Sequence, residues 1–422
     1  MRTISDRARG LGTENAFVVL KEALERIAAG KDVKNFCIGQ PDFVTPDHIR
    51  LAAVRALIEG KTGYTPSAGI PELRAAVAQA MRRTRGLEVL PSDVVVGCGA
   101  KPFIGYVVQT VTDPGAGHEV IFPVPGFPIY ESQVRAQGAV PVPIPLRERN
   151  GFHLDPDELA AAISPRTRLV ILNSPHNPTG SVMDLRRLEA IAAVLRRHEQ
   201  VWIFSDEPYA ALVYEHEHAS IATLPGMVER TVVVDGASKT YAMPGWRVGW
   251  AINRALAPVL ERWVTNTDSC APHLCQWAAV EALNTSQAPT ALMRSSFQRR
   301  RDLVIDGLNE ISGVICRRSE GAFYAWPNVT DLCRRVSAAD SEALRVRLLR
   351  EADVALLSDI HFGPRIPGEG QHLRLSFAAS IADLEEGLRR IERFARATRR
   401  QLRAPAGSEA ALGAGAVVGS GA

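Results

Sequence analysis

Short apolar runs and helical patterns alternate through the middle of the chain. The runs are rich in β-branched residues and are continuous rather than alternating, which is typical of strands buried on both faces of a parallel sheet. We expect such strands at 94–96, 119–122, 139–144, 168–172, 201–204 and 231–234. Helical patterns at 156–163 and 184–197 fall between strands, as crossover helices do. The pattern predicts an α/β fold with a mostly parallel central sheet.

Helical patterns lie on both sides of this region. Before it, we expect a helix from Thr13 to Gly30, a strand-like run at 35–39, and helices at 47–59 and 71–85. After residue 254, we expect helices at 271–284, 288–311, 340–351 and 381–398. The strands expected there are at 313–318, 322–326 and 371–377. The second half therefore favours a smaller α+β domain beside the larger α/β one.

Composition and charge exclude several classes of protein. Of 422 residues, 46% are apolar and 23% are charged, close to the average for globular proteins. A wholly disordered chain, a collagen and a disulfide-stapled miniprotein are excluded. The formal charge of +3 gives no reason to expect a nucleic-acid surface.

The sequence also bears on compartment and metals. We expect no secretory signal, because the first ten residues lack an apolar segment, and no membrane-spanning helix. The six cysteines are scattered without the spacing of a zinc site, so we expect free thiols and no metal. These observations favour a reducing cytoplasm.

Lysine is scarce in this chain. Six of the 49 basic residues are lysine: Lys21, Lys31, Lys34, Lys61, Lys101 and Lys239. Lys239 follows the strand 231–234 among small residues. Burial there would lower its pKa and supply the neutral amine that Schiff-base chemistry needs. A solvated loop lysine is the alternative interpretation.

Three elements suited to an anion occur in separate regions. Arg247 lies in a G-W-R-V-G segment, and its guanidinium can donate two parallel hydrogen bonds to a phosphate. Ser238 offers a hydroxyl. Gly99, Ala100 and Lys101 follow the strand 94–96 and open a helix, whose first N–H groups favour anions. Each is a weak signal, and the three together are a stronger one.

Further polar and aromatic residues follow other strands. Asp206 and Tyr209 come after 201–204, Asn177 lies in a Pro-rich loop after 168–172, and Phe127 follows 119–122. Ligands of open α/β sheets bind beyond the carboxyl ends of the strands, where these residues are expected. Turn formation would explain Asp206 and Asn177 without a ligand, and core packing would explain Phe127.

Together these motifs resemble the class I/II aminotransferases, the aspartate-aminotransferase-like group of fold type I pyridoxal-phosphate enzymes. The resemblance covers about residues 15 to 397. It rests on Ser-Lys followed by G-x-R-x-G, on D-x-x-Y, N-P-T-G and Gly-Ala-Lys, and on two terminal segments, Tyr64 to Arg74 and Leu373 to Phe377. Any one motif is weak, but their number, order and spacing make a chance match improbable.

The resemblance implies pyridoxal 5′-phosphate as the cofactor, bound as a Schiff base to Lys239, which also moves the substrate proton. Asp206 is implied as the partner of the pyridinium nitrogen, and Tyr209 and Asn177 as donors to the 3-oxygen. Phe127 is implied to stack on the ring. The implied phosphate-binding residues are Gly99, Ala100, Lys101, Ser238 and Arg247.

The resemblance also implies substrate contacts and a partner. Arg374 is implied to bind the substrate α-carboxylate, assisted by the Gly39 N–H and with Asn177 close by. Tyr64 is implied to reach the phosphate from a second subunit, and hence a homodimer. One departure from the family pattern is Asp359-Ile360-His361, where many relatives have a small Pro-Gly turn. This loop puts the ordinary substrate range in doubt, unless it merely packs differently.

The implied domain organisation has four parts. Residues 1–44 form an N-terminal arm and part of the small domain, 45–288 the large cofactor-binding domain, and 289–400 the rest of the small domain. The end of the chain, 401–422, is low in large apolar residues and is expected to be disordered.

We therefore expect a pyridoxal-phosphate-dependent aminotransferase acting on an L-amino acid and a 2-oxo acid. The alternative on the same fold is an elimination, replacement or C–C bond-forming enzyme, such as a C–S lyase or one that processes S-adenosylmethionine. A non-catalytic ligand-binding regulator is a further alternative, and the short segment before the first helix speaks against it. The sequence does not indicate the substrate side chain.

Overall fold

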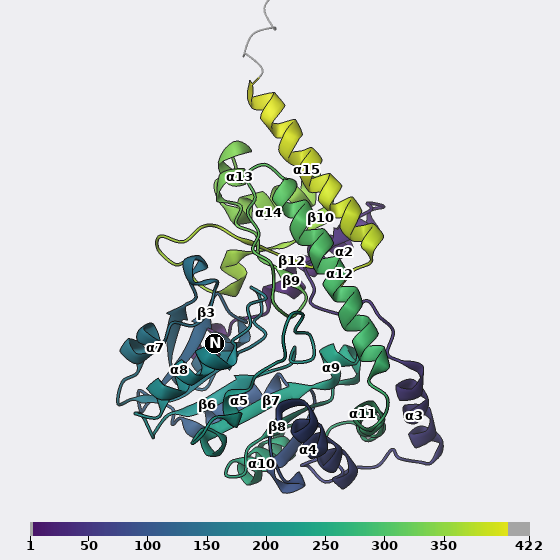
Figure 1. Cartoon of the computed structure of the whole chain (residues 1–422), viewed down its shortest axis with the longest axis vertical. Coiled ribbons are helices and arrows are strands. Elements are labelled where there is room, and N and C mark those ends of the chain that lie inside the picture. Colours follow the sequence, from purple (N-terminus) through teal and green to yellow (C-terminus); the bar gives the residue numbers. More distant parts are fainter. Residues whose placement is uncertain (1–2, 404–422) are drawn as a thin grey trace, which may run out of the picture.

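A seven-stranded sheet forms the centre of the computed structural model, which describes residues 3–403 (Figure 1). The strands lie in the order β2-β8-β7-β6-β5-β3-β4. Their bounds are β2 (Val94–Gly97), β3 (Glu119–Val124), β4 (Val140–Pro145), β5 (Thr167–Asn173), β6 (Trp202–Asp206), β7 (Thr231–Gly236) and β8 (Gly249–Ile252). Only β8 runs antiparallel to its neighbours β2 and β7, and the expected mostly parallel α/β sheet is confirmed.

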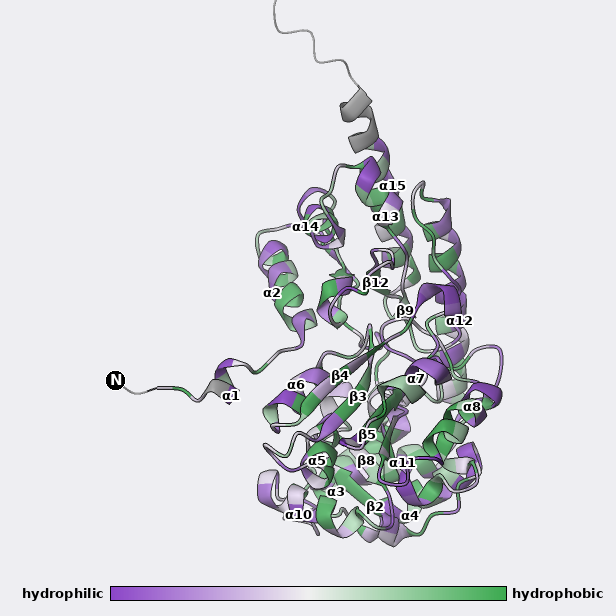
Figure 2. Ribbon diagram, turned by 90° about the vertical axis from the view of Figure 1, so that its left-hand side faces the viewer, coloured by the Kyte–Doolittle hydropathy of each residue, from purple (hydrophilic) through white to green (hydrophobic). Residues whose placement is uncertain are grey.

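Both faces of this sheet are covered, which explains its continuous apolar strands (Figure 2). Alternate residues, such as Val120, Phe204 and Val232, pack on one face against α5 (Pro102–Val111), α6 (Ile129–Ala136) and α10 (Ala257–Thr267). Their neighbours pack on the other face against α4 (Pro71–Arg85), α7 (Pro156–Ala162), α8 (Leu185–Leu195) and α11 (His273–Asn284). Because side chains alternate along a strand, two apolar faces require apolar residues at every position.

A second group of elements joins the two ends of the chain. Strand β1 (Lys34–Asn35) pairs in parallel with β10 (Val354–Ala355), and a three-stranded sheet has the order β11-β12-β9. Its strands are β9 (Tyr324–Ala325), β11 (Leu357–Ser358) and β12 (Leu373–Ser376). The long helices α12 (Ala288–Glu310) and α15 (Ile381–Arg403) lie side by side over it (Figure 1). The other helices are α1 (Asp6–Arg9), α2 (Asn15–Ala28), α3 (Asp47–Ile58), α9 (Ala237–Thr240), α13 (Thr330–Arg335) and α14 (Ser341–Glu351).

Local chemistry explains where several predicted elements begin and end. Helix α4 spans the residues expected for it, with Pro71 at its first position and Gly86 in a left-handed conformation (φ 68°) after it. The Asp184 carboxylate accepts a hydrogen bond from the Arg187 N–H and caps the start of α8.

Other expectations were wrong. Residues 313–318 form no strand: Ile315 makes one isolated bridge to Asn328, because the Asn309 side chain takes up the backbone groups of Cys316. The run at 35–39 is a strand only at Lys34–Asn35. The sequence patterns also missed β8 and α10. The expected disorder of 401–422 falls almost wholly outside the described residues; Gln401 to Arg403, which are described, continue α15 rather than forming a disordered segment.

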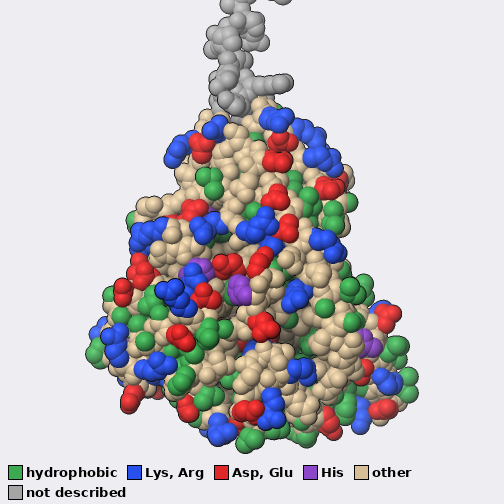
Figure 3. Space-filling model, viewed as in Figure 1, with side chains coloured by type: hydrophobic (Ala, Val, Ile, Leu, Met, Phe, Trp, Pro, Cys, Tyr) green, Lys and Arg blue, Asp and Glu red, His purple; other side chains and the backbone are tan. Residues whose placement is uncertain are grey.

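Two findings concern membranes and metals. Within residues 3–403, no helix is both long and apolar enough to cross a membrane. The same residues contain no group of three or more His, Cys, Asp or Glu side chains placed to hold a metal ion. On the face seen in Figure 3, basic and acidic side chains are interspersed, with no large field of one sign.

Candidate active site

A cavity of about 490 Å³ lies where the parallel strands end. Asn173 ends β5, Asp206 ends β6, and the two residues are paired in register. Residues of the small sheet and of the N-terminal segment complete the lining, including Tyr324, Arg374 and Glu14. The cavity therefore lies at the carboxyl edge of the sheet, where α/β proteins bind ligands.

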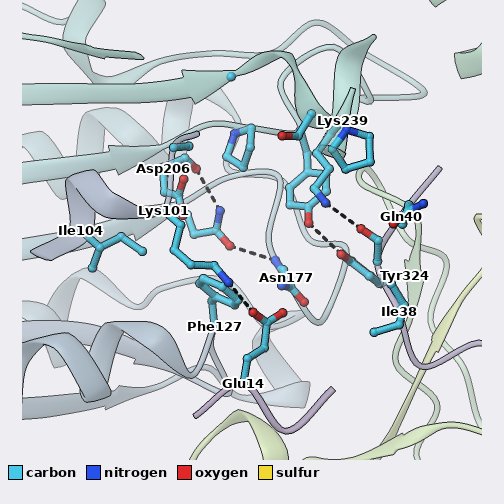
Figure 4. A pocket seen from close by; sticks show the side chains of 18 of the residues that line it. Glu14, Ile38, Gln40, Lys101, Ile104, Phe127, Asn177, Asp206, Lys239 and Tyr324 are labelled. Atoms are coloured by element: carbon cyan, nitrogen blue, oxygen red, sulfur yellow. Dashed lines mark hydrogen bonds and ion pairs between the residues drawn. The ribbon is translucent and has the colours of Figure 1, made fainter. Parts of the chain in front are cut away.

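Lys239 lies in the wall of this cavity, in the short helix α9 just after β7. Its Nζ donates a hydrogen bond to the Gly39 carbonyl oxygen at 2.7 Å (Figure 4). The loss of water around the ammonium lowers the pKa of Lys239 to about 8; Glu14 opposes this shift, and Arg374, Lys101 and Arg247 add to it. Within the described chain Lys239 forms no ion pair, so its amine is available to a ligand.

Asp206 is buried opposite Lys239 and is held by one side chain. Its Oδ2 accepts a hydrogen bond of 2.5 Å from the hydroxyl of Tyr130, which is fully buried on α6. Burial raises the pKa of Asp206 to about 7; the Tyr130 hydrogen bond opposes this rise, and Asp235 and Glu207 add to it. No cation among residues 3–403 pairs with Asp206, so its carboxylate is free to accept an N–H from a ligand.

Tyr209 and Asn177 are each held by a hydrogen bond to another residue of the cavity lining. The hydroxyl groups of Tyr209 and Tyr324 are hydrogen-bonded at 2.7 Å. The Asn177 Oδ1 accepts a hydrogen bond from Arg374 Nη1 at 2.9 Å, and its backbone N–H donates to Asn173 Oδ1. This arrangement orients the Asn177 side-chain N–H₂ group and the two phenols along the cavity lining.

Arg374 on β12 is buried without an anionic partner in the described chain. Its Nη2 donates to the Cys37 carbonyl oxygen at 2.6 Å, and its guanidinium packs over the rings of Tyr324 (4.4 Å) and Phe362 (4.9 Å). Its Nε is buried and unbonded. Leaving a guanidinium buried and unpaired is costly, so this geometry favours an anionic ligand.

A second cationic end is formed by Ser238, Arg247 and the start of α5. Arg247 has a left-handed backbone (φ 55°) and donates to the Cys98 and Pro244 carbonyl oxygens. A Cβ atom at Gly99 would lie 2.2 Å from Arg247 Nη2, so only glycine allows this approach. Ala100 and Lys101 line the cavity immediately before α5, which begins at Pro102.

The cavity lining contains most of the residues expected from the sequence. It includes Gly39, Ala100, Lys101, Phe127, Asn177, Asp206, Tyr209, Ser238, Lys239, Arg247 and Arg374. Gly99 lies directly behind Arg247 rather than in the lining. Tyr64 is 90% exposed and does not reach this cavity within one chain.

Sequence reasoning missed several lining residues. Tyr130 stands three positions after Phe127, a helical spacing that could have indicated a second aromatic residue facing the site. No role was predicted for Tyr324. Glu14 and Phe17 carried no signal, because they reach the cavity from an N-terminal segment far from it in sequence.

The loop at Asp359-Ile360-His361 does not line the cavity. It forms a short 3-10 helix (Asp359–Phe362), in which Asp359 accepts hydrogen bonds from Ser341 Oγ and the His372 N–H. Phe362 connects this segment to the site, because its ring lies under the Arg374 guanidinium.

Comparisons with known proteins agree with this geometry. Residues 31–391 match the model of the family "Aminotransferase class I and II". The chain is 39% identical over 406 residues to an aspartate/prephenate aminotransferase of Cereibacter sphaeroides, covering 93% of this chain and 99% of that one. It is 38% identical to an arginine–pyruvate transaminase of Pseudomonas aeruginosa, over 87% and 91% of the two chains.

Solved structures are similar as well. An aspartate aminotransferase from Rhizobium meliloti superposes with a TM-score of 0.88 at 35% identity, covering 94% of this chain and 99% of that one. An aspartate aminotransferase from Thermus thermophilus with maleate gives a TM-score of 0.87 at 36% identity, covering 93% and 100%.

Proposed function

The chain belongs to the class I and II aminotransferases, and from this premise we propose how its residues serve the reaction. It is a pyridoxal-phosphate-dependent transferase of fold type I that moves an amino group between an L-amino acid and a 2-oxo acid. The elimination, replacement and C–C bond-forming alternatives are not favoured, because the relatives at 35–39% identity are aminotransferases over nearly their full length.

The cavity fits the cofactor at both of its ends. Arg247, Ser238 and the backbone N–H groups of Ala100 and Lys101 would hold the phosphate, and glycine at position 99 leaves room for the Arg247 guanidinium beside it. Asp206 would accept the N–H of the pyridinium ring, and Phe127 would stack on the ring. The fit is supported by Asp206 and Arg247 lining one cavity while forming no ion pair within the described chain.

The bound cofactor supplies an electron sink for the substrate Cα bond and carries the amino group between the two half-reactions. Lys239 would hold the aldehyde carbon of the cofactor through its amine. Once released, this amine would take the proton from the substrate Cα and return it. A pKa of about 8 suits both roles, because a large fraction of the amine is neutral near pH 8.

Other residues orient the reactants. Tyr209 and Asn177 would donate hydrogen bonds to the 3-oxygen of the cofactor. Arg374 would bind the substrate α-carboxylate through its guanidinium, assisted by Gly39. The α-carboxylate contact decides which Cα bond stands perpendicular to the ring, and hence which bond breaks.

One observation carries this proposal: Lys239, a partly buried amine without an ion pair, lies in one cavity with Asp206 and Arg374. The test is to mix the enzyme containing its cofactor with single amino acids and to record the absorption spectrum. We expect stoichiometric conversion to the pyridoxamine form, and no conversion in Lys239→Ala. Continued release of oxo acid and ammonia without an acceptor, or turnover by Lys239→Ala, would contradict the proposal.

A homodimer is the second part of the proposal. Tyr64 is 90% exposed, and helix α3 before it leaves Leu51, Val54, Leu57 and Ile58 between 50% and 79% exposed. Such an apolar face suits a second copy of the chain, which would carry Tyr64 to the partner's phosphate. Sedimentation analysis should show a dimer. Tyr64→Phe should weaken cofactor binding without dissociating the dimer. A monomer that binds the cofactor normally would contradict this part of the proposal.

We also propose the domain division and the compartment. The pairing of β1 with β10 supports a small domain built from 1–44 and 289–400, beside a large domain of 45–288. The six free cysteines support a reducing compartment such as the cytoplasm. Limited proteolysis near residue 288 and cell fractionation test these two statements.

A further inference from the structure

A second cavity, of about 280 Å³, shares a wall with the cavity of the candidate active site, here called the main cavity. The shared wall is the segment that follows β7. Ser238 and Lys239 of this segment line the main cavity, whereas Thr240 and Tyr241 line the second one. Gly236 lines both cavities. The second cavity therefore lies behind the segment that carries the reactive amine.

The second cavity also spans the proposed division between the two domains. The large domain contributes Met81, Arg85 and Leu283, and helix α12 contributes Thr290 and Arg294. Sites for small molecules occur preferentially at such domain boundaries. Among the described residues that line the cavity, none belongs to α3, the helix proposed to face a second copy of the chain.

The charges around the second cavity are not balanced. Arg85 is buried and neutralised, because its Nε donates to Glu207 at 2.7 Å and its Nη2 to Asp235 at 2.5 Å. Arg83 and Arg294 are exposed and form no ion pair with any residue between 3 and 403. Asp235 is the only acidic residue of the described lining, and it is already paired. Two guanidinium groups are thus left for an anion.

Much of the remaining lining is apolar. Met81, Trp250 and Leu283 contribute aliphatic and aromatic surface, and the Tyr241 ring adds to it. Such a surface favours a ligand with an apolar body. The volume is just below the roughly 300–1,000 Å³ that is typical of ligand sites, so the ligand must be small. Charge and surface together fit a small organic carboxylate.

We propose that the second cavity binds a small carboxylate with an apolar body, held by Arg83 and Arg294, and that this ligand is an effector of the enzyme. The effect would pass through the shared wall. A ligand that binds one position of this wall more tightly than another changes the population of the two positions, and with it the placement of Lys239. This inference goes beyond the proposed function, because it adds a site that the reaction itself does not use.

The experiment uses benzoate as the probe and Arg374→Ala as the background, which removes the guanidinium proposed to bind carboxylates in the main cavity. Calorimetry on this enzyme with its cofactor should show one benzoate per chain, with a Kd of about 1 mM or less. Arg83→Gln and Arg294→Gln, each added to this background, should raise that Kd about tenfold or more. Arg82→Gln is the matched control, because Arg82 is an exposed neighbour on α4 that pairs with Glu88 outside the lining.

The effector role is tested through the cofactor. Coupling between two sites is reciprocal, so saturating benzoate should change the Kd of the cofactor about fivefold or more in the Arg374→Ala background. Adding Arg83→Gln and Arg294→Gln together should abolish this change. A change that persists without these two arginines would come from benzoate in the main cavity, and would overturn the effector role.

The remaining outcomes separate this inference from the proposed function. If benzoate does not bind, or binds equally to the Arg82→Gln, Arg83→Gln and Arg294→Gln enzymes, the second site is overturned. If it binds through the two arginines but leaves the Kd of the cofactor unchanged, the effector role is overturned. Neither measurement needs turnover, so both hold whether or not the enzyme transaminates, which the spectral test of Lys239→Ala decides.

Discussion

Tyr130 donates a hydrogen bond of 2.5 Å from its hydroxyl to the Asp206 carboxylate, and both side chains are buried. The two residues come from different elements, α6 and β6. The bond holds the carboxylate at the end of its strand and opposes the rise in its pKa that burial causes. Tyr130 is thus a positioning residue in the proposed site.

Tyr130→Phe should therefore alter the pH dependence of the reaction. Without the donor, the pKa of Asp206 rises further, so the ionised carboxylate is lost at a higher pH. We expect the acidic limb of the kcat/KM profile to move to higher pH, and activity at neutral pH to fall about tenfold. A lower rate with an unmoved profile would show that Tyr130 acts only by packing.

The cofactor-free enzyme should lose stability as the pH rises from about 4 to about 7. The pKa of Asp206 is raised from 3.8 to about 7 in the folded chain, so across this window the folded state holds a proton that the unfolded state has released. Stability is then greatest below the unfolded pKa and decreases through the folded one, by a few kcal/mol at most. Asp206→Asn should remove this contribution. The difference between the urea midpoints of the two proteins, recorded from pH 5 to 8, measures it. Parallel curves would contradict the assignment.

Arg374→Ala should reduce kcat/KM for every amino acid, whatever its side chain. The guanidinium would bind the α-carboxylate that all substrates share, and losing a buried charged contact should cost about a hundredfold or more. Arg374→Lys should recover little, because an ammonium lacks the planar fork. Cofactor affinity serves as the control and should change little; a loss confined to one class of side chain would refute this role.

Gly99→Ala should weaken cofactor binding more than it weakens the fold. The new Cβ would lie 2.2 Å from Arg247 Nη2 and displace that guanidinium. Gly30→Ala is the matched control, since Gly30 has a similar φ (+82° against +91°) and no atom within 4 Å of its Cβ position. Both variants should lose about 1 kcal/mol of unfolding free energy from backbone strain. Only Gly99→Ala should raise the Kd of the cofactor. Equal Kd values for the two variants would disprove the proposal that Gly99 keeps Arg247 placed for cofactor binding.

Local patterns predicted most of the fold. Helix α4 and the strands β2 to β7 were recognised because their apolar patterns are set by neighbouring residues of the chain. Strand β8 was not predicted, and its first residue, Gly249, was interpreted as the end of the anion-binding G-W-R-V-G segment. The run at 313–318 was misassigned because the Asn309 side chain, and not a neighbouring strand, bonds its backbone.

Part of the candidate site could likewise be predicted from the sequence, and part of it could not. Lys239, Asp206 and Asn177 could be proposed from the sequence because each follows a predicted strand, and parallel strands bring their carboxyl ends together. The Tyr130 bond, the unpaired state of Arg374 and the Glu14 pair with Lys101 could not, because each joins segments that are remote in sequence.

The sequence by itself determined the order of elements, the α/β class and the residues that stand at strand ends, since these depend on periodicity and on nearby turn chemistry. Only the tertiary structure decided which charges are neutralised. Glu14 and Lys101 are 87 residues apart and Arg374 and Asn177 are 197 apart. Whether a charge is cancelled or left for a substrate depends on distances of a few ångströms between such residues, and only the packing of the whole chain sets those distances.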